Sequence, residues 1–329
     1  MRQIILTFAA IPDKMYFRGI ILFLALFTMS NLVAQVTFKN SEFSIANEND
    51  VYLLLDNDKY YSNGIITHYR WVPKEIPLDS VKKILDIELS QKFFTPQDLN
   101  LLSFSNYDRP YAGLLYGGFS INTFKEENRR SMIGIELGVV GRGSGAQGFQ
   151  EWYHDVFGFP KPQGWEFQIP NEIVFNLRSE FNRQFILKPS QLDVISSTEL
   201  SLGTAFTHGV QRLDLRLGKL QSLRNSSFKN AMIGRGSEVT PRHNYFFLGY
   251  GLQYVLHNIT INGSIWNSEA PHTEIATPWV RHLRFGWVSN SDKATFKITY
   301  NWSSPEVSGI RRHAYLGLEL LLRFPPKSE

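Results

Sequence analysis

The chain has 329 residues, no cysteine and a formal net charge of +4 at pH 7. This length suits one large domain or two ordinary ones, and so small a charge without a basic patch argues against nucleic-acid binding. The absence of cysteine excludes a disulfide framework, so stability must come from packing or from strand pairing. Aromatic residues make up 14% of the chain, yet the mean hydropathy is −0.20. This combination favours a sheet whose two faces meet different environments, because successive strand positions alternate sides.

The N-terminus has the pattern of an export signal. Basic residues precede the apolar run of residues 19–34, which ends on Ala34. The run is shorter than the roughly 20 residues that a spanning helix needs, and a small closing residue suits signal peptidase. We therefore predict a signal peptide over residues 1–34, with Met15 as an alternative start and an uncleaved anchor helix as the competing interpretation. Residues 35–329 are predicted to form a single domain.

Apolar and polar residues alternate through the rest of the chain. In residues 313–324 every even-numbered position is Ala, Leu or Phe, whereas the odd-numbered positions include His313, Glu319 and Arg323. A period of two is that of a strand with one apolar face. The same period marks residues 130–141 and 293–302. Further strand candidates are residues 37–48, 52–55, 60–72, 85–94, 111–124, 172–187, 193–207, 211–220, 245–257, 260–266 and 280–289.

Strand length distinguishes a soluble sandwich from a membrane barrel. Many candidates reach about ten residues or more, roughly twice the usual length in soluble proteins, which matches a tilted membrane-spanning strand. Tyr300, Trp302 and Phe324 lie near strand ends, where an interfacial aromatic girdle would lie. A bilayer offers no water to the unpaired backbone groups of an edge strand, so the sheet must close into a barrel. The candidates number about a dozen, and twelve is the even number of strands that we expect. We predict an all-β fold, a closed antiparallel transmembrane β-barrel of about twelve strands.

Three long connections are candidates for outward-facing loops, namely residues 95–110, 144–170 and 224–241. The stretch from Gly143 to Gly148 fits the dinucleotide-binding pattern G-x-G-x-x-G. That site needs a parallel sheet covered by helices, and helix-period segments are almost absent here, so we reject it. The glycines are instead predicted to let a strand turn into a short outer helix.

That helix is predicted over residues 149–157. It would place Gln150 and His154 one turn apart on the same face. A single histidine is more often a packing residue than a base, so this spacing needs supporting residues elsewhere.

Oxygen-bearing side chains gather near the start of the mature chain. Asn47-Glu48-Asn49-Asp50 is followed closely by Asp56-Asn57-Asp58. Carboxylate and amide oxygens are ligands that a hard cation such as calcium accepts. A turn rich in Asx residues is the competing interpretation, and the residues alone leave both open.

A series of motifs occurs in one order along the chain: E-N-D at 48–50, D-x-Y-Y-S-N-G at 58–64, F-F-T-P at 93–96, D-R-P-Y-A-G at 108–113, Q-x-x-x-H at 150–154 and P-x-G-W-x-x-Q-x-x-N-E at 162–172. As a set it resembles the outer-membrane lipid A 3′-O-deacylase family, over roughly residues 43–329. The resemblance implies a twelve-stranded barrel in the bacterial outer membrane, with its site between the barrel wall and the outer loops. It also implies calcium-dependent hydrolysis of the ester-linked acyl chains at the 3′ position of lipid A.

The same resemblance assigns residues. Asn49 and Asp50 match the family's Asn-Asp pair, Ser62 stands in place of its threonine, and His154 matches its catalytic histidine. Gln150 fits the Q-x-x-x-H pattern and, with Asp50, is the candidate ligand for Ca²⁺. A neutral histidine can take a proton from water, and a divalent ion can stabilise the oxyanion of the ester. The implied partners are lipid A, lipopolysaccharide and other outer-membrane lipids, bound by a monomer.

Two family positions differ. Pro160 stands where the family has a glutamate six residues after the histidine, and residues 101–102 are leucines where it has a basic pair. Lys161, Glu166 and Arg109 are the nearby candidates to replace them. Two alternatives therefore stay open: a non-catalytic structural or pore-forming barrel, and a calcium-dependent outer-membrane phospholipase.

Overall fold

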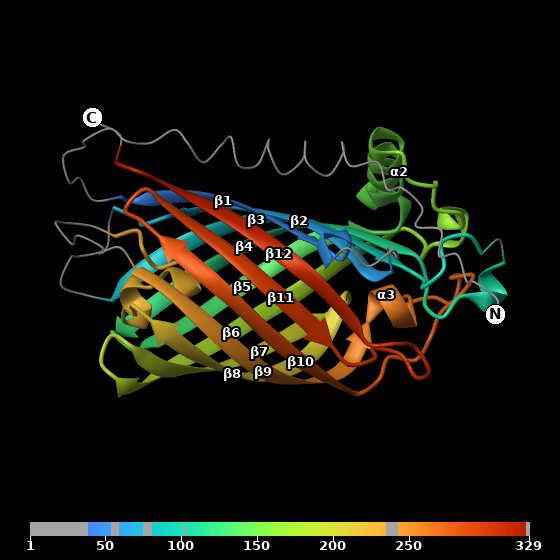
Figure 1. Cartoon of the computed structure of the whole chain (residues 1–329). Coiled ribbons are helices and arrows are strands. Elements are labelled where there is room, and N and C mark those ends of the chain that lie inside the picture. The colour runs from blue at the N-terminus through green and yellow to red at the C-terminus, as the bar shows by residue number, and fades with distance from the viewer. Residues whose placement is uncertain (1–38, 54–58, 75–80, 102, 235–242, 327–329) are drawn as a thin grey trace, which may run out of the picture.

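A computed structural model describes residues 39–53, 59–74, 81–101, 103–234 and 243–326. Within them twelve antiparallel strands form a closed barrel, in which β1 pairs with β12 and every other neighbour is adjacent in the chain (Figure 1). The strands are β1 Ser41–Asn49, β2 Tyr60–Trp71, β3 Lys82–Thr95, β4 Ala112–Glu126, β5 Arg129–Val140, β6 Glu172–Lys188, β7 Leu192–Gly203, β8 Phe206–Gly218, β9 His243–Asn258, β10 Trp279–Asn290, β11 Ala294–Ser303 and β12 His313–Phe324. The predicted fold class is confirmed. No helix among the described residues is both long and apolar enough to cross a membrane. The predicted signal peptide lies outside the described residues.

Three strand predictions were wrong in detail. The candidate at 52–55 begins in a 3₁₀ turn, η1 (Val51–Leu53), and its last two residues lie outside the described chain. The candidate at 260–266 begins in the short helix α3 (Ile259–Asn262). The candidate at 193–207 runs through a tight turn at Thr204 and Ala205, which separates β7 from β8.

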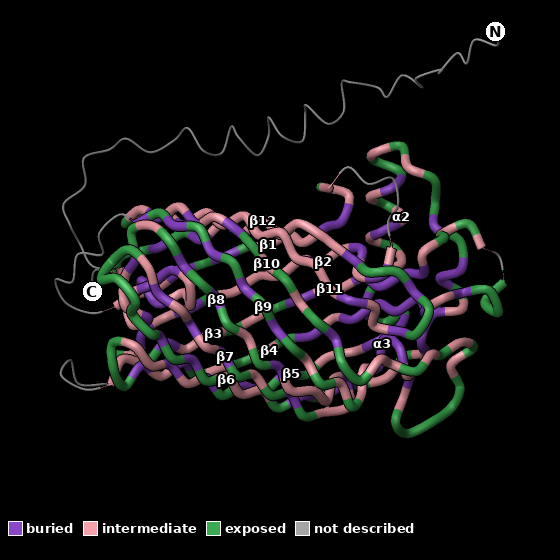
Figure 2. Tube along the Cα trace, turned by 60° about the horizontal axis from the view of Figure 1, so that its bottom comes forward, coloured by how far each residue is buried: buried purple, intermediate pink, exposed green. Residues whose placement is uncertain are grey.

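Buried and exposed residues alternate along the strands (Figure 2), and the residues of β5 show that the exposed face is apolar and the lumen face polar. On β5, Ile133 and Leu137 are more than 60% exposed on the outside, whereas Arg130 and Glu136 are buried. A soluble protein would show the reverse, and a bilayer requires this arrangement. Exposed rings lie at strand ends, as in the Tyr254–Trp279 contact with centroids 4.7 Å apart.

The two ends of the barrel differ. We call one end the outer end. It carries the connections that follow β1, β3, β5, β7, β9 and β11, and the connection after β5 contains helix α2 (Ala146–Phe157). The other, the inner end, holds the start of β1 and the end of β12. Long loops on one side and mostly short turns on the other are typical of outer-membrane barrels.

The connection at 224–241 was predicted as an outer loop, and that prediction was wrong. Eight strands precede it, so it lies at the inner end, where the described part of the β8–β9 connection, residues 219–234, folds back into the lumen. We call residues 219–234 the inner segment. Its Lys229 forms an ion pair with Glu180 of β6, and its Ser226 accepts a hydrogen bond from Arg216 of β8.

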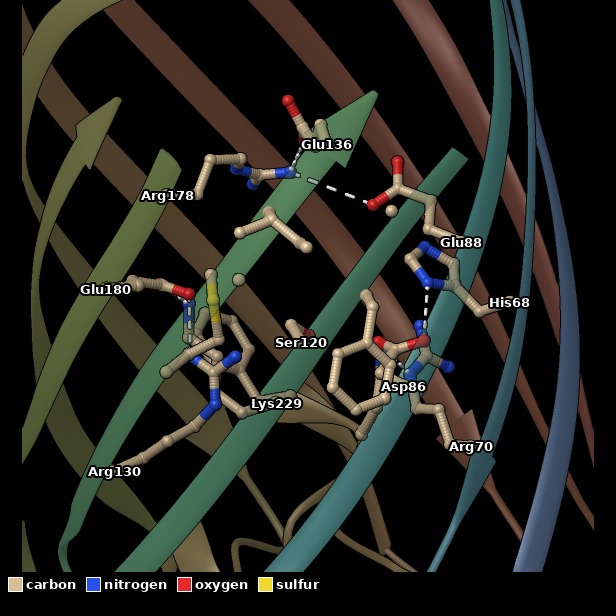
Figure 3. A pocket seen from close by; sticks show the side chains of 17 residues that line it. His68, Arg70, Asp86, Glu88, Ser120, Arg130, Glu136, Arg178, Glu180 and Lys229 are labelled. Carbon is tan, nitrogen blue, oxygen red and sulfur yellow. Dashed lines mark hydrogen bonds and ion pairs between the residues drawn. The ribbon is translucent and has the colours of Figure 1, made fainter. Parts of the chain in front are cut away.

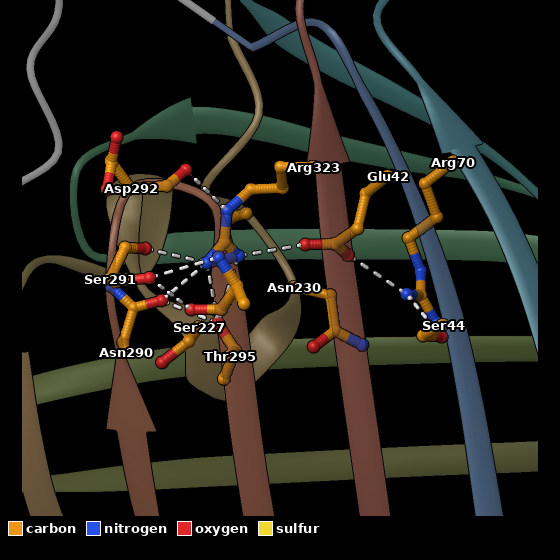
Figure 4. A network of polar contacts seen from close by, with 12 residues as sticks. Glu42, Ser44, Arg70, Ser227, Asn230, Asn290, Ser291, Asp292, Thr295 and Arg323 are labelled. Carbon is orange, nitrogen blue, oxygen red and sulfur yellow. Dashed lines mark hydrogen bonds and ion pairs between the residues drawn. The ribbon is translucent and has the colours of Figure 1, made fainter. Parts of the chain in front are cut away.

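Buried ion pairs tie the inner end together (Figure 4). Arg323 of β12 binds Glu42 of β1 at 3.2 Å, and Glu42 also binds Arg70 of β2 at 3.1 Å. All three side chains are at most 5% exposed. Arg323 donates further hydrogen bonds to Thr295 and Asn290. The network therefore joins the first and last strands where the barrel closes.

Candidate active site

Glycines form the junction between β5 and helix α2. Gly141 and Gly145 adopt φ values of 91° and 69°, which side chains disfavour. Gly145 is the residue that immediately precedes α2, and Gly158, with φ 73°, ends it. A Cβ on Gly113 of β4 would collide with Ser144 and Ala146, so this glycine lets the junction lie against the barrel wall. The glycines of the fingerprint-like stretch therefore redirect the chain into a helix, as predicted.

His154 is held by the residue that replaces the family's glutamate. It is 4% exposed, and its Nδ1 lies 2.6 Å from the backbone carbonyl oxygen of Pro160. A carbonyl can only accept, so Nδ1 carries the proton. The lone pair of the neutral ring is then on Nε2, which is the form that a general base needs. The turn after α2, in which Phe159 donates to the carbonyl of His154 at 2.9 Å, brings Pro160 back to the ring.

Gln150 lies one turn before His154 on the same buried face, as predicted. Its Oε1 accepts a hydrogen bond of 2.8 Å from the indole of Trp165. Trp165 is 1% exposed and packs with Tyr107, Tyr111 and other side chains of the outer end. Gln150 therefore anchors α2 to this aromatic cluster. Trp165 lies in the P-x-G-W motif, which by itself does not reveal this role.

Asn49 ends β1 at the outer end, Asp50 follows it, and Ser62 lies on the neighbouring strand β2. Asn49 pairs with Asn63, the residue after Ser62, and all three predicted residues are buried. Asn49 Oδ1 accepts from the amide of Val51 at 2.8 Å, and Asp50 Oδ2 accepts from the amide of Lys59 at 2.9 Å. Asn49 and Asp50 therefore do bond to nearby backbone amides, as the Asx-turn interpretation predicts. Asp56-Asn57-Asp58 lies outside the described residues.

One packing contact links these strands with α2. The hydroxyl of Ser62 donates to the carbonyl of Phe93 on β3 at 3.5 Å, and the Phe93 ring lies 5.5 Å from that of Phe149 on α2. Phe149 immediately precedes Gln150. The structure thus places the predicted residues in two groups, one on β1 and β2 and one on α2, with Phe93 between them.

The D-R-P-Y-A-G motif fixes the loops of the outer end. Asp108 accepts from the amide of Gln97 at 2.9 Å and from the hydroxyl of Tyr60 at 3.0 Å. Arg109 is fully buried, where it contacts Glu306 at 3.1 Å and donates to Thr260 of α3 at 3.0 Å. Burial lowers the pKa of Arg109 below its usual range, against the opposing effect of Glu306. The motif therefore joins three separate connections.

These contacts limit which residues replace the family's basic pair. Arg109 is buried and paired, so it positions loops and does not face a lipid phosphate. Leu101 packs on the aromatic cluster, and Leu102 lies outside the described residues. Lys161 is exposed and pairs with exposed Asp155 at 3.0 Å, an arrangement that contributes little energy.

A second arrangement resembles a catalytic triad but has the wrong hydrogen-bond direction. At the inner end, Ser227 Oγ lies 2.8 Å from His243 Nε2, and Asn290 Nδ2 lies 3.3 Å from His243 Nδ1. The Asn290 Oδ1 already accepts from Arg323, so its amide nitrogen donates to Nδ1. The proton of His243 is then on Nε2, facing Ser227. This histidine cannot take a proton from the serine, and the group is structural.

The lumen contains polar cavities and many charged side chains. One cavity of about 240 Å³ is lined by alternating acids and bases, including Arg178, which binds Glu136 at 2.6 Å (Figure 3). Another, of about 410 Å³, lies nearer the outer end. Lys229 of the inner segment lines the first cavity. Side chains thus fill much of the interior, as expected for a barrel of this size.

Comparisons with known proteins agree with this geometry. A family model described as outer membrane protein LpxR matches residues 21–324. The chain belongs to the LpxR family. This confirms the family that the motif series predicted, and it places the barrel in the bacterial outer membrane, also as predicted.

Among solved structures, LpxR from Salmonella typhimurium matches with a TM-score of 0.70 and 18% identity, covering 86% of this chain and 100% of that chain. At this identity the likeness shows the fold. The β domain of the Bordetella autotransporter BrkA matches with a TM-score of 0.43 and 10% identity, covering 87% and 98% of the two chains, too weakly to support an argument. Comparison with curated protein sequences gives no match.

Proposed function

We propose that this LpxR family member is an ester hydrolase that removes 3′-linked acyl chains from lipid A, with His154 as the general base. The observation that carries the proposal is the orientation of His154. Its Nδ1–H is directed to the Pro160 carbonyl, so the neutral ring has its basic nitrogen at Nε2. Its burial on the face of α2 that packs against the barrel limits competition from bulk water. Pro160 thus supplies through its backbone an orienting acceptor, although it lacks the family's carboxylate.

The other site residues have supporting roles in this proposal. Nε2 of His154 takes a proton from water as the water attacks the ester carbonyl, and it returns the proton to the departing alkoxide. Ser62 lies at the junction between the strands and α2, where its hydroxyl donates to the Phe93 carbonyl and so positions β3 beside the helix. Gln150 keeps the helix in place through Trp165.

We also propose calcium as the cofactor. Asn49 and Asp50 are buried neighbours that offer amide and carboxylate oxygens, the donor types that calcium prefers, so the residues fit the ion in kind. They would hold it at the outer end of β1. Gln150, which the sequence pairs with Asp50 as a candidate ligand, lies on α2, where its Oε1 accepts from Trp165. Calcium, when bound, supplies positive charge that stabilises the developing oxyanion.

Mass spectrometry of lipid A tests the proposal. Cells that express the wild type should lose the 3′ acyl mass, and cells that express His154→Ala should keep it. His68→Ala, on the lumen side of β2 beside Asp86, is the histidine control and should behave as the wild type. An unchanged acylation pattern with folded wild-type barrel present would contradict the deacylase proposal. Fatty acid release from glycerophospholipid instead would support the phospholipase alternative.

The lumen argues against the pore-forming alternative. Ion pairs cross the interior, and the inner segment inserts Lys229 beside Glu180. A barrel filled in this way should not conduct ions as an open channel does. Planar-bilayer recordings of the purified protein should therefore show no steady conductance.

A further inference from the structure

Helix α2 buries two polar side chains and exposes two large apolar ones, with the charged Asp155 beside them. Gln150 and His154 are 5% and 4% exposed, whereas Trp152 and Val156 are 56% and 53% exposed. Trp152 and Val156 are four residues apart, so they lie on one face. A helix surrounded by water shows the opposite pattern, with its apolar stripe inward. The exposed face of α2 is therefore suited to an apolar environment.

Aromatic contacts connect this exposed face with the candidate site. The ring of Trp152 lies 5.4 Å from that of Phe149, and Phe149 lies 5.5 Å from Phe93 of β3. Phe93 is 1% exposed, and its carbonyl accepts from Ser62. We call Trp152, Phe149 and Phe93 the aromatic ladder. It leads from the surface of α2 to the strand beside the proposed catalytic residues.

The position of α2 is continuous with the lipid-facing wall. The helix follows β5, whose outward side chains Ile133, Ile135 and Leu137 are exposed, and it packs on β3 and β4. Figures 1 and 2 both show α2 beside the barrel wall and not over the lumen. Apolar side chains at this place meet the outer leaflet of the membrane.

We propose that the exposed part of the aromatic ladder, Trp152 with half-buried Phe149, is an acyl-chain contact, along which a chain of an outer-leaflet lipid lies to bring its ester to His154. Buried Phe93 supports the contact from the barrel wall. The identity of that lipid as a substrate rests on the proposed function, whereas the lipid contact does not. The aromatic ladder offers only apolar surface, so it binds the acyl chain of the lipid. The ester and the sugar are bound by the polar residues of the site.

Site-directed spin labelling tests the contact without using activity. The chain has no cysteine, so Val156→Cys and Ser105→Cys each carry a single nitroxide. Both native residues are exposed, but Ser105 lies in the connection between β3 and β4, away from the exposed face of α2. In bilayers of lipopolysaccharide and phospholipid, the label at 156 should collide several-fold more with oxygen than with a water-soluble nickel complex, and the label at 105 should show the reverse.

Two results of that experiment would overturn the proposal. Equal access of the nickel complex at both positions would mean that the face meets water. Exclusion of both reagents at 156 would mean that another protein copy covers it.

Kinetics test whether the contact positions substrate. Trp152→Ser should raise KM for bilayer-embedded lipid A on the order of tenfold, with kcat unchanged, because one large apolar contact is lost. Trp266→Ser is the matched control, since Trp266 is 74% exposed but lies in the β9–β10 connection. Equal KM values for the two variants would contradict a positioning role. If the wild type hydrolyses no lipid A while the label at 156 is in lipid, the contact is supported and only the proposed function fails.

Discussion

The two ends of this barrel are stabilised by different chemistry. The inner end is tied by buried ion pairs, such as Arg216 with Asp193 at 2.7 Å. The outer end is packed from aromatic side chains around Trp165. Charge networks at the inner end join strands and the inner segment to one another. The aromatic cluster at the outer end holds a helix that carries the proposed base. We infer that changes at the inner end should affect stability, and changes at the outer end should affect activity.

The largest expected effect is at the outer end. Trp165→Phe removes the indole N–H that holds Gln150 but keeps a ring beside Tyr107 and Tyr111, so α2 should shift while the cluster stays packed. A displacement of about 1 Å at a reacting group can lower the rate roughly 100-fold. We expect a loss of that order in ester hydrolysis, with the urea midpoint of the barrel nearly unchanged. If the variant also lowered the urea midpoint in proportion to its loss of hydrolysis, the outer end would affect stability as well as activity. That result would contradict the proposed difference between the two ends.

A change at the inner end should have the opposite signature. Arg216→Ala leaves Asp193 buried without its cation, which costs about 3 kcal/mol of unfolding free energy. Urea unfolding in vesicles measures this, and activity per folded molecule should be unchanged. The double variant Arg216→Met with Asp193→Leu should recover much of the stability, because no buried charge is then unpaired. Failure to recover would show that other contacts of Arg216 dominate.

The smallest effect tests the junction before α2. Gly145→Ala forces a side chain into a left-handed conformation at φ 69°, which costs about 1 kcal/mol and should lower activity a few-fold. Gly148→Ala is the matched control inside α2, where an added Cβ meets nothing within 4 Å. Alanine there should stabilise the helix by about 1 kcal/mol, since glycine is a poor helix former. Equal activity of the two variants would argue against a strained junction.

The strands were predictable because a barrel in a bilayer needs strict alternation, and β12 matches its predicted bounds. Alternation failed where tertiary packing removed the distinction between faces. Ile259, Thr260 and Ile261 are all buried, and Asn258 caps the turn through Thr260, so a strand-like sequence forms α3. The tight turn after Gly203 consists of Thr204 and Ala205, which are not typical turn residues. The predicted strand at 193–207 therefore extended through the turn.

The site was predictable only as a set of residue types. The Q-x-x-x-H spacing gave the shared face of Gln150 and His154, since helical geometry fixes it. The Pro160 carbonyl could not be predicted, because a backbone acceptor leaves no mark in the side-chain sequence. The sequence offers Arg109 as a replacement for the basic pair, but its burial against Glu306 depends on a loop nearly 200 residues away.

The rate of 3′ acyl release by purified protein tests the central claim most directly. Wild type and His154→Ala would be refolded into vesicles that contain lipid A and calcium, with heat-modifiable migration showing that both barrels are folded. If His154 is the base, the variant should be slower by at least about 100-fold. Equal rates for the two folded proteins would contradict the assignment of His154.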